Sequence, residues 1–119
     1  MALMVVGLLS STMAIAQAPK TVKLEQTTGA FTTNKTLKLK AGTPYVFEVK
    51  NQDVDHAVGF VLAPKKENIA MEDHIKEAYL SKTIEAGETG KSQEVTLEAG
   101  EYVFFCPLNP TPQYTVVVK

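Results

Sequence analysis

Cysteine is nearly absent from this chain, and its single thiol, Cys106, excludes a fold held together by disulfides. Small exported domains that depend on disulfides show paired cysteines, whereas one thiol cannot cross-link its own chain. Cys106 must therefore be buried and inert, paired between two molecules, or bound to a metal ion.

Clusters of basic residues with interleaved aromatic residues are missing as well. Lys and Arg total 12 and Asp and Glu total 13, so the formal net charge is −1. Such a chain has no surface that could follow a phosphate backbone, and nucleic acid is excluded as a partner. The charges are scattered, which is typical of solvated strand faces.

Charge is absent from residues 1–18, where an apolar run is followed by small residues ending in Ala14-Ile15-Ala16. This pattern predicts a secretory signal peptide, residues 1–16, although no Lys or Arg precedes the apolar run. A retained anchor is the alternative, but the run is interrupted by Ser10-Ser11-Thr12 and is only marginally long enough to span a bilayer. We expect a single domain over residues 17–119, periplasmic or secreted, with no stable membrane span after cleavage.

Short segments rich in Val, Thr, Phe and Tyr alternate with turn signals along the rest of the chain. Apolar residues fall at every second place in "TLKLK", "YVFEVKN" and "SQEVTLE". The pattern predicts an all-β fold of half-buried antiparallel strands in two packed sheets, with one short amphipathic helix, Met71–Leu80. The expected strands are Thr21–Thr28, Thr36–Lys40, Tyr45–Asn51, Val58–Leu62, Ser92–Glu98, Glu101–Phe105 and Tyr114–Lys119.

Metal ligands are few, since His56, His74 and Met71 are the only soft or borderline donors besides Cys106 in the predicted mature chain. His56 and Cys106 each follow a predicted strand, and two strand ends of one sandwich can meet at the same pole. A thiolate beside an imidazole suits copper, because thiolate selects Cu(I) and imidazole binds both oxidation states.

Several segments together resemble a small cupredoxin-like domain: Gly42 before a strand ending at Asn51, then His56, "EAGET", "GEYVFFCP" and a closing "YTVVVK". The resemblance implies a Greek-key β-sandwich and, in typical members, a type 1 copper site for electron transfer. That site uses one early His and, on the last loop, a Cys, a second His and usually a Met. His56 matches the first His and Cys106 matches the Cys.

The last loop departs from the family pattern C-x2-H-x2-M, because this chain has "CPLNPTPQ". Asn109 stands at the second His position, Pro112 stands at the Met position, and no His or Met follows Cys106. Gln113 could supply a weak axial oxygen, so the candidate metal ligands are His56, Cys106 and Gln113. Asn109→His would restore the C-x2-H spacing.

The sequence has too few suitable residues for a catalytic, zinc or dinuclear copper site. A Cys–His nucleophile lacks an evident activator and oxyanion hole, so we expect no enzymatic activity. A structural zinc site needs four N or S ligands, whereas the chain offers only Cys106, His56 and His74. A dinuclear copper centre of the family requires two cysteines and is excluded by the single thiol. The open alternatives are a packed thiol for Cys106, a loop His56 bonded to Asp53 or Asp55, a helix-surface His74 paired with Asp73 or Glu77, and a core-facing Met71.

Two functions therefore stay open. The first is an exported, monomeric cupredoxin-like protein with an atypical copper site, acting in electron transfer or copper handling with a redox or copper-delivery protein partner. The second is a metal-free β-sandwich that binds a protein partner. The absence of a second His from the last loop favours the metal-free binding module. The paired positions of His56 and Cys106 favour the copper-binding protein.

Overall fold

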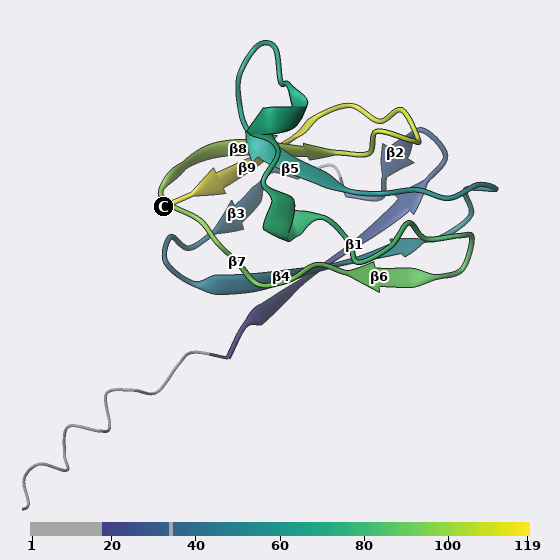
Figure 1. Cartoon of the computed structure of the whole chain (residues 1–119), viewed down its shortest axis with the longest axis horizontal. Coiled ribbons are helices and arrows are strands. Elements are labelled where there is room, and N and C mark those ends of the chain that lie inside the picture. The colour runs from purple at the N-terminus through teal and green to yellow at the C-terminus, as the bar shows by residue number, and fades with distance from the viewer. Residues whose placement is uncertain (1–17, 34) are drawn as a thin grey trace, which may run out of the picture.

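The computed structural model describes residues 18–33 and 35–119 as two β-sheets packed face to face (Figure 1). One sheet has the order β2-β1-β4-β6, with β7 also paired to β4, and the other has the order β3-β9-β8-β5. The strands of the first sheet are β1 (Lys20–Thr27), β2 (Ala30–Phe31), β4 (Pro44–Asn51), β6 (Thr89–Lys91) and β7 (Val95–Thr96). Those of the second are β3 (Leu37–Leu39), β5 (Val61–Pro64), β8 (Gly100–Phe105) and β9 (Tyr114–Val118).

The predicted β-sandwich is confirmed, but the expectation of purely antiparallel strands is wrong. β1 runs parallel to β4, with Lys20 opposite Tyr45, and β3 runs parallel to β9, with Leu37 opposite Val116. Chain segments that cross from one sheet to the other separate the two strands of each parallel pair, so local alternation could not reveal their relative direction.

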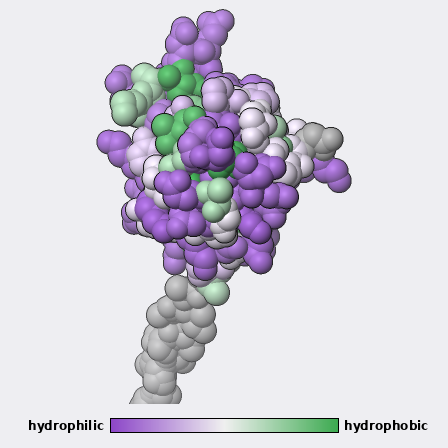
Figure 2. Space-filling view, turned by 90° about the vertical axis from the view of Figure 1, so that its right-hand side faces the viewer, coloured by the Kyte–Doolittle hydropathy of each residue, from purple (hydrophilic) through white to green (hydrophobic). Residues whose placement is uncertain are grey.

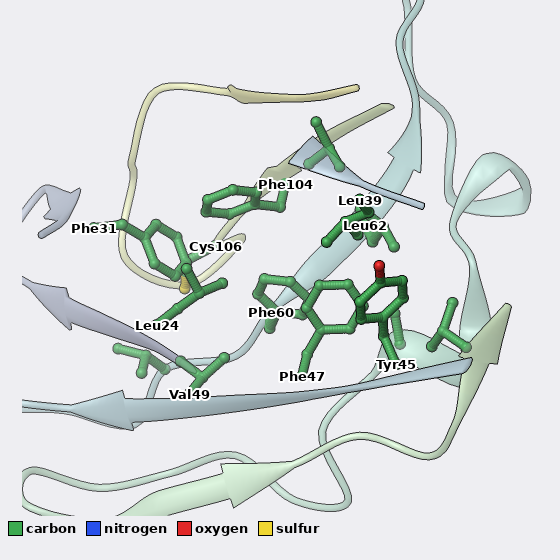
Figure 3. Close-up of a cluster of buried hydrophobic side chains, with 14 of the residues drawn as sticks. Leu24, Phe31, Leu39, Tyr45, Phe47, Val49, Phe60, Leu62, Phe104 and Cys106 are labelled. Carbon is green, nitrogen blue, oxygen red and sulfur yellow. The ribbon is translucent and has the colours of Figure 1, made fainter. Parts of the chain in front are cut away.

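The core lies between the sheets and is built from the alternating faces of the strands (Figure 3). In β4, Tyr45, Phe47 and Val49 are buried at every second position, as the period of a strand requires. Aromatic rings join the two layers: Phe31 meets Phe104 edge to face with ring centroids 4.9 Å apart. These contacts fix the end of the sandwich at which the last loop begins.

The predicted helix Met71–Leu80 is replaced by two 3₁₀ turns, η2 (Met71–Asp73) and η3 (Lys76–Ala78). His74, between them, has an extended backbone, and the next N–H, that of Ile75, donates to the carbonyl of Leu62 at 2.8 Å. This bond to β5 takes the donor that a continuous helix would need for its own ladder. Helical periodicity in a ten-residue segment is therefore overridden by a tertiary hydrogen bond.

The predicted signal peptide, residues 1–16, lies outside the described residues, as does Gln17. Its cleavage stays a prediction. In the described part of the chain, no helix has both the length and the apolar character needed to cross a membrane.

Candidate metal centre at the cysteine end of the sandwich

Cys106 is the first residue after β8, where the chain turns into the loop of residues 106–113, called the Cys loop below. The side chain is 3% exposed and lies beside Leu24 and Phe31 at the edge of the core (Figure 3). Its Sγ accepts hydrogen bonds from the N–H of Gly59 at 3.4 Å and of Asn109 at 3.2 Å. The backbone N–H of Cys106 donates to Thr111 Oγ1 at 3.2 Å.

His56 lies on the segment that leaves β4, and its side chain is exposed. Its Nδ1 is 3.0 Å from the carbonyl oxygen of Ala57, and the alternative partners Asp53 and Asp55 are not among its hydrogen-bond contacts. This segment reaches the Cys106 sulfur through the N–H of Gly59, three residues further on, rather than through an imidazole contact. Proximity of His56 and Cys106 sufficient for a shared metal ion stays a prediction.

Asn109, at the position of the absent second His, is 2% exposed, and its side chain is directed at β1 and the turn that follows it. Its Oδ1 accepts the N–H of Gly29 at 2.9 Å. Its Nδ2 donates to the carbonyl of Thr27 at 2.9 Å and to Oε1 of Gln26 at 3.1 Å. The amide is therefore committed to hydrogen bonds, and an imidazole at this position would have to break them.

Gln26 is fully buried and completes a closed set of hydrogen bonds. Its Nε2 donates to the carbonyl of Gly59 at 2.7 Å, and the N–H of the same Gly59 donates to Cys106 Sγ. Gln26, Gly59, Cys106 and Asn109 are thus linked in a loop that we call the amide ring. Gln26 was not among the predicted site residues, although a glutamine in phase with Val22 and Leu24 of an alternating strand is a signal for a buried amide.

The third candidate ligand, Gln113, is exposed near the end of the Cys loop, next to exposed Pro112. Within residues 18–33 and 35–119, no three His, Cys, Asp or Glu side chains are grouped so that they could hold a metal ion. His56 and Gln113 are exposed on their loops, whereas Cys106 is buried, and the union of the three in one ligand set stays a prediction.

A type 1 copper ion needs a thiolate and two imidazoles in its equatorial plane. The Cys loop has no His, and the amide at the corresponding position is fully hydrogen-bonded. Throughout the described residues, every buried side-chain nitrogen and oxygen has a hydrogen-bond partner, so no orphaned polar atom marks a ligand position. The residues at this end do not fit a type 1 copper site.

A cavity of about 470 Å³ opens beside the Cys loop, between it and the segment that carries η2 and η3. Met71, predicted to face the core, is instead 77% exposed at this cavity, because the segment does not form the continuous helix that would have turned it inward. His74 also lines the cavity, and its Nδ1 is 2.7 Å from the hydroxyl oxygen of Tyr79. The full lining is Gly59, Phe60, Val61, Met71, His74, Tyr79, Leu80, Lys82, Thr83, Pro107 and Leu108.

The His74 ring is packed rather than free at the surface. It meets Tyr79 and Phe105 edge to face, with ring centroids 5.9 and 6.2 Å apart. Asp73, an expected partner of His74, is paired instead with Lys66, with 3.1 Å between Oδ2 and Nζ. His74 therefore belongs to the wall of the cavity, and the cavity shares the Cys loop with the amide ring.

The two-sheet sandwich, with its cysteine directly after the penultimate strand, has the architecture of a cupredoxin-like β-sandwich. The sequence matches the family model described as a cupredoxin-like domain over residues 1–118, so the chain belongs to the cupredoxin-like family. No curated protein matches it.

Among solved structures, auracyanin B is 19% identical, with a TM-score of 0.68 over 88% of this chain and 93% of that one. Auracyanin A, a "blue" copper protein of Chloroflexus aurantiacus, is 19% identical, with a TM-score of 0.69 over 86% of this chain and 100% of that one. Rusticyanin of Thiobacillus ferrooxidans is 16% identical, with a TM-score of 0.57 over 86% of this chain and 79% of that one. At such identities these likenesses establish the fold.

Proposed function

We propose that this protein is a cupredoxin-like binding module that works without a type 1 copper ion and binds a protein partner at the cavity beside the Cys loop. One observation carries the proposal. Met71 and Leu108, the large hydrophobic residues exposed among those described, both line this same cavity. Figure 2 shows hydrophobic surface near the top of the end that faces the viewer, with hydrophilic side chains around it. The proposal includes no catalytic activity.

The lining of the cavity contains both buried core residues and exposed hydrophobic side chains. Phe60 and Val61 in its lining are buried, whereas Met71 is 77% and Leu108 is 49% exposed. Leu108 stands between Pro107, whose φ is fixed by its ring, and Asn109, whose side chain is held by β1. A rigid apolar pocket with a flexible thioether at its edge is the kind of surface that accepts an anchor side chain of a partner.

The charges around the cavity favour an acidic partner segment. Lys82 is the charged residue of the lining, and no Asp or Glu belongs to the lining. Its Nζ lies 3.6 Å from Glu88 Oε2 in an exposed ion pair, which is weak enough to exchange partners. We therefore expect the partner to present an aromatic or aliphatic side chain flanked by a carboxylate.

Selection of displayed peptides against the intact protein tests this proposal. We expect enrichment of peptides with one central apolar residue next to Asp or Glu, and we expect Leu108→Ser and Met71→Ser to weaken their binding at least roughly tenfold. Gln113→Ser, on the same loop but outside the cavity lining, is the matched control and should bind as the parent does. Failure to enrich such peptides, or equal binding by all three variants, would refute the proposal.

A second function, copper binding at Cys106 with His56 for electron transfer or copper handling, is favoured by the surroundings of the Cys106 sulfur. The Cys106 sulfur accepts hydrogen bonds from the N–H groups of Gly59 and Asn109, and outer-shell bonds of this kind orient a ligand toward a metal ion. Such a protein would act in the periplasm or outside the cell with a redox or copper-delivery protein.

Metal analysis and copper titration of the purified protein decide this second function. One retained equivalent of copper, with a thiolate charge-transfer band that His56→Ala abolishes, would support it. A protein that is purified metal-free, retains no added Cu(I) and stays colourless with Cu(II) would contradict it.

A further inference from the structure

We infer that the amide ring replaces a metal ion as the tie that closes the cysteine end of the sandwich, with Asn109 and Gln26 as its central residues. The ring joins β1, the segment around Gly59 and the Cys loop. In a copper-binding member of this fold class, coordination would tie a loop His to the cysteine loop. Here side-chain amides make that connection.

The links of the ring are long-range in sequence, so they hold segments that the backbone alone would leave apart. Asn109 is bonded to Gln26 across 83 residues, and Gln26 to Gly59 across 33 residues. Gly59 is bonded to the Cys106 sulfur across 47 residues. Breaking one link therefore frees a loop rather than a single side chain.

Asn109 makes a combination of hydrogen bonds that only a side-chain amide can make. Its nitrogen donates two hydrogen bonds and its oxygen accepts one. A neutral imidazole has one donor and one acceptor, and a carboxylate has acceptors only, which would face the oxygens of Gln26 and Thr27. The chemistry of position 109 is thus matched to the ring and not to a metal ion.

The burial of Gln26 and Asn109 supports their role as the central residues of the amide ring. Gln26 is 0% and Asn109 is 2% exposed, so water cannot replace a lost partner without opening the end of the sandwich. The Cys106 sulfur, also buried, is reached by reagents only when the Cys loop leaves β1. Reactivity of this thiol therefore reports on closure of the ring.

The test compares the parent protein with Asn109→Ala. The parent should melt at the same temperature with a chelator, without metal, and with one equivalent of copper. Asn109→Ala should melt roughly 10 °C lower, because buried donors and acceptors lose their partner. Its thiol should react with Ellman's reagent roughly tenfold faster under native conditions, since opening becomes easier. Gln113→Ala, an exposed change on the same loop, should alter neither quantity.

Two results would overturn the inference. One is a rise of several degrees in the melting temperature of the parent on adding copper; the other is an Asn109→Ala variant with unchanged melting and thiol reactivity. If that variant does not fold, hydrogen exchange of the parent decides. The N–H groups of Gly59 and Asn109, both bonded to Cys106 Sγ, should exchange slowly, and rapid exchange would refute the ring. None of these outcomes depends on peptide binding at the cavity.

Discussion

Replacing Gln26 with methionine tests whether the amide ring stabilises the fold or only fills space. Methionine has a similar length and volume, so the change removes the hydrogen bonds with little loss of packing. The carbonyl of Gly59 loses its 2.7 Å donor, while Asn109 Nδ2 keeps the carbonyl of Thr27. The main effect should therefore be one unsatisfied, part-buried carbonyl.

Leaving a buried acceptor unsatisfied costs about 1–3 kcal/mol, and we expect Gln26→Met to lower the free energy of unfolding by about 2 kcal/mol. Urea unfolding followed by circular dichroism measures this, with the slope of the transition unchanged. Gln52→Met, an exposed glutamine next to β4, is the control and should change stability by less than about 0.5 kcal/mol.

A double-mutant cycle sharpens the result. Because Gln26 and Asn109 share one hydrogen bond, the loss in Gln26→Met/Asn109→Ala should be smaller than the sum of the single losses. Strict additivity, or a Gln26→Met variant as stable as the Gln52→Met control, would refute the idea of a connected ring.

Two further changes test packing and charge elsewhere. Gly90→Ala should lower the free energy of unfolding by about 1–3 kcal/mol in the same urea assay, because a Cβ there would lie 2.8 Å from Cγ2 of buried Ile84. The control is Gly59→Ala, whose Cβ would meet nothing within 4 Å, and its loss of stability should be clearly smaller. Equal losses for the two variants would contradict the steric argument. The N–H of Ala70 holds the pKa of Asp73 below its ordinary value of 3.8, so this carboxylate stabilises the fold above the unfolded-state pKa and loses that contribution as pH falls through the folded-state pKa. Thermal melts from pH 6 to pH 2 should show a smaller acid-induced decrease for Asp73→Asn than for the parent, and parallel curves would contradict the assignment.

Much of the fold could be predicted from local sequence, because a strand repeats every two residues. The burial of Tyr45, Phe47 and Val49 follows directly from that period. The family could also be predicted, by a resemblance that rests on several segments together, among them His56, "GEYVFFCP" and the closing "YTVVVK". Strand direction could not, because β1 and β4 are brought together only by the crossing of the chain between sheets.

The sequence alone determined that a second imidazole is missing from the Cys loop, and therefore that a complete type 1 ligand set cannot form there. Only the tertiary structure decided what Asn109 does instead. Its partners, Gln26, Thr27 and Gly29, lie about eighty residues earlier in the chain and become neighbours when the Cys loop folds onto β1. Met71 differs from its prediction for the same reason: a hydrogen bond from Ile75 to β5 ends the helix that would have buried it. Local periodicity records which residues prefer to be buried, whereas the pairing of buried polar groups depends on which distant segments meet.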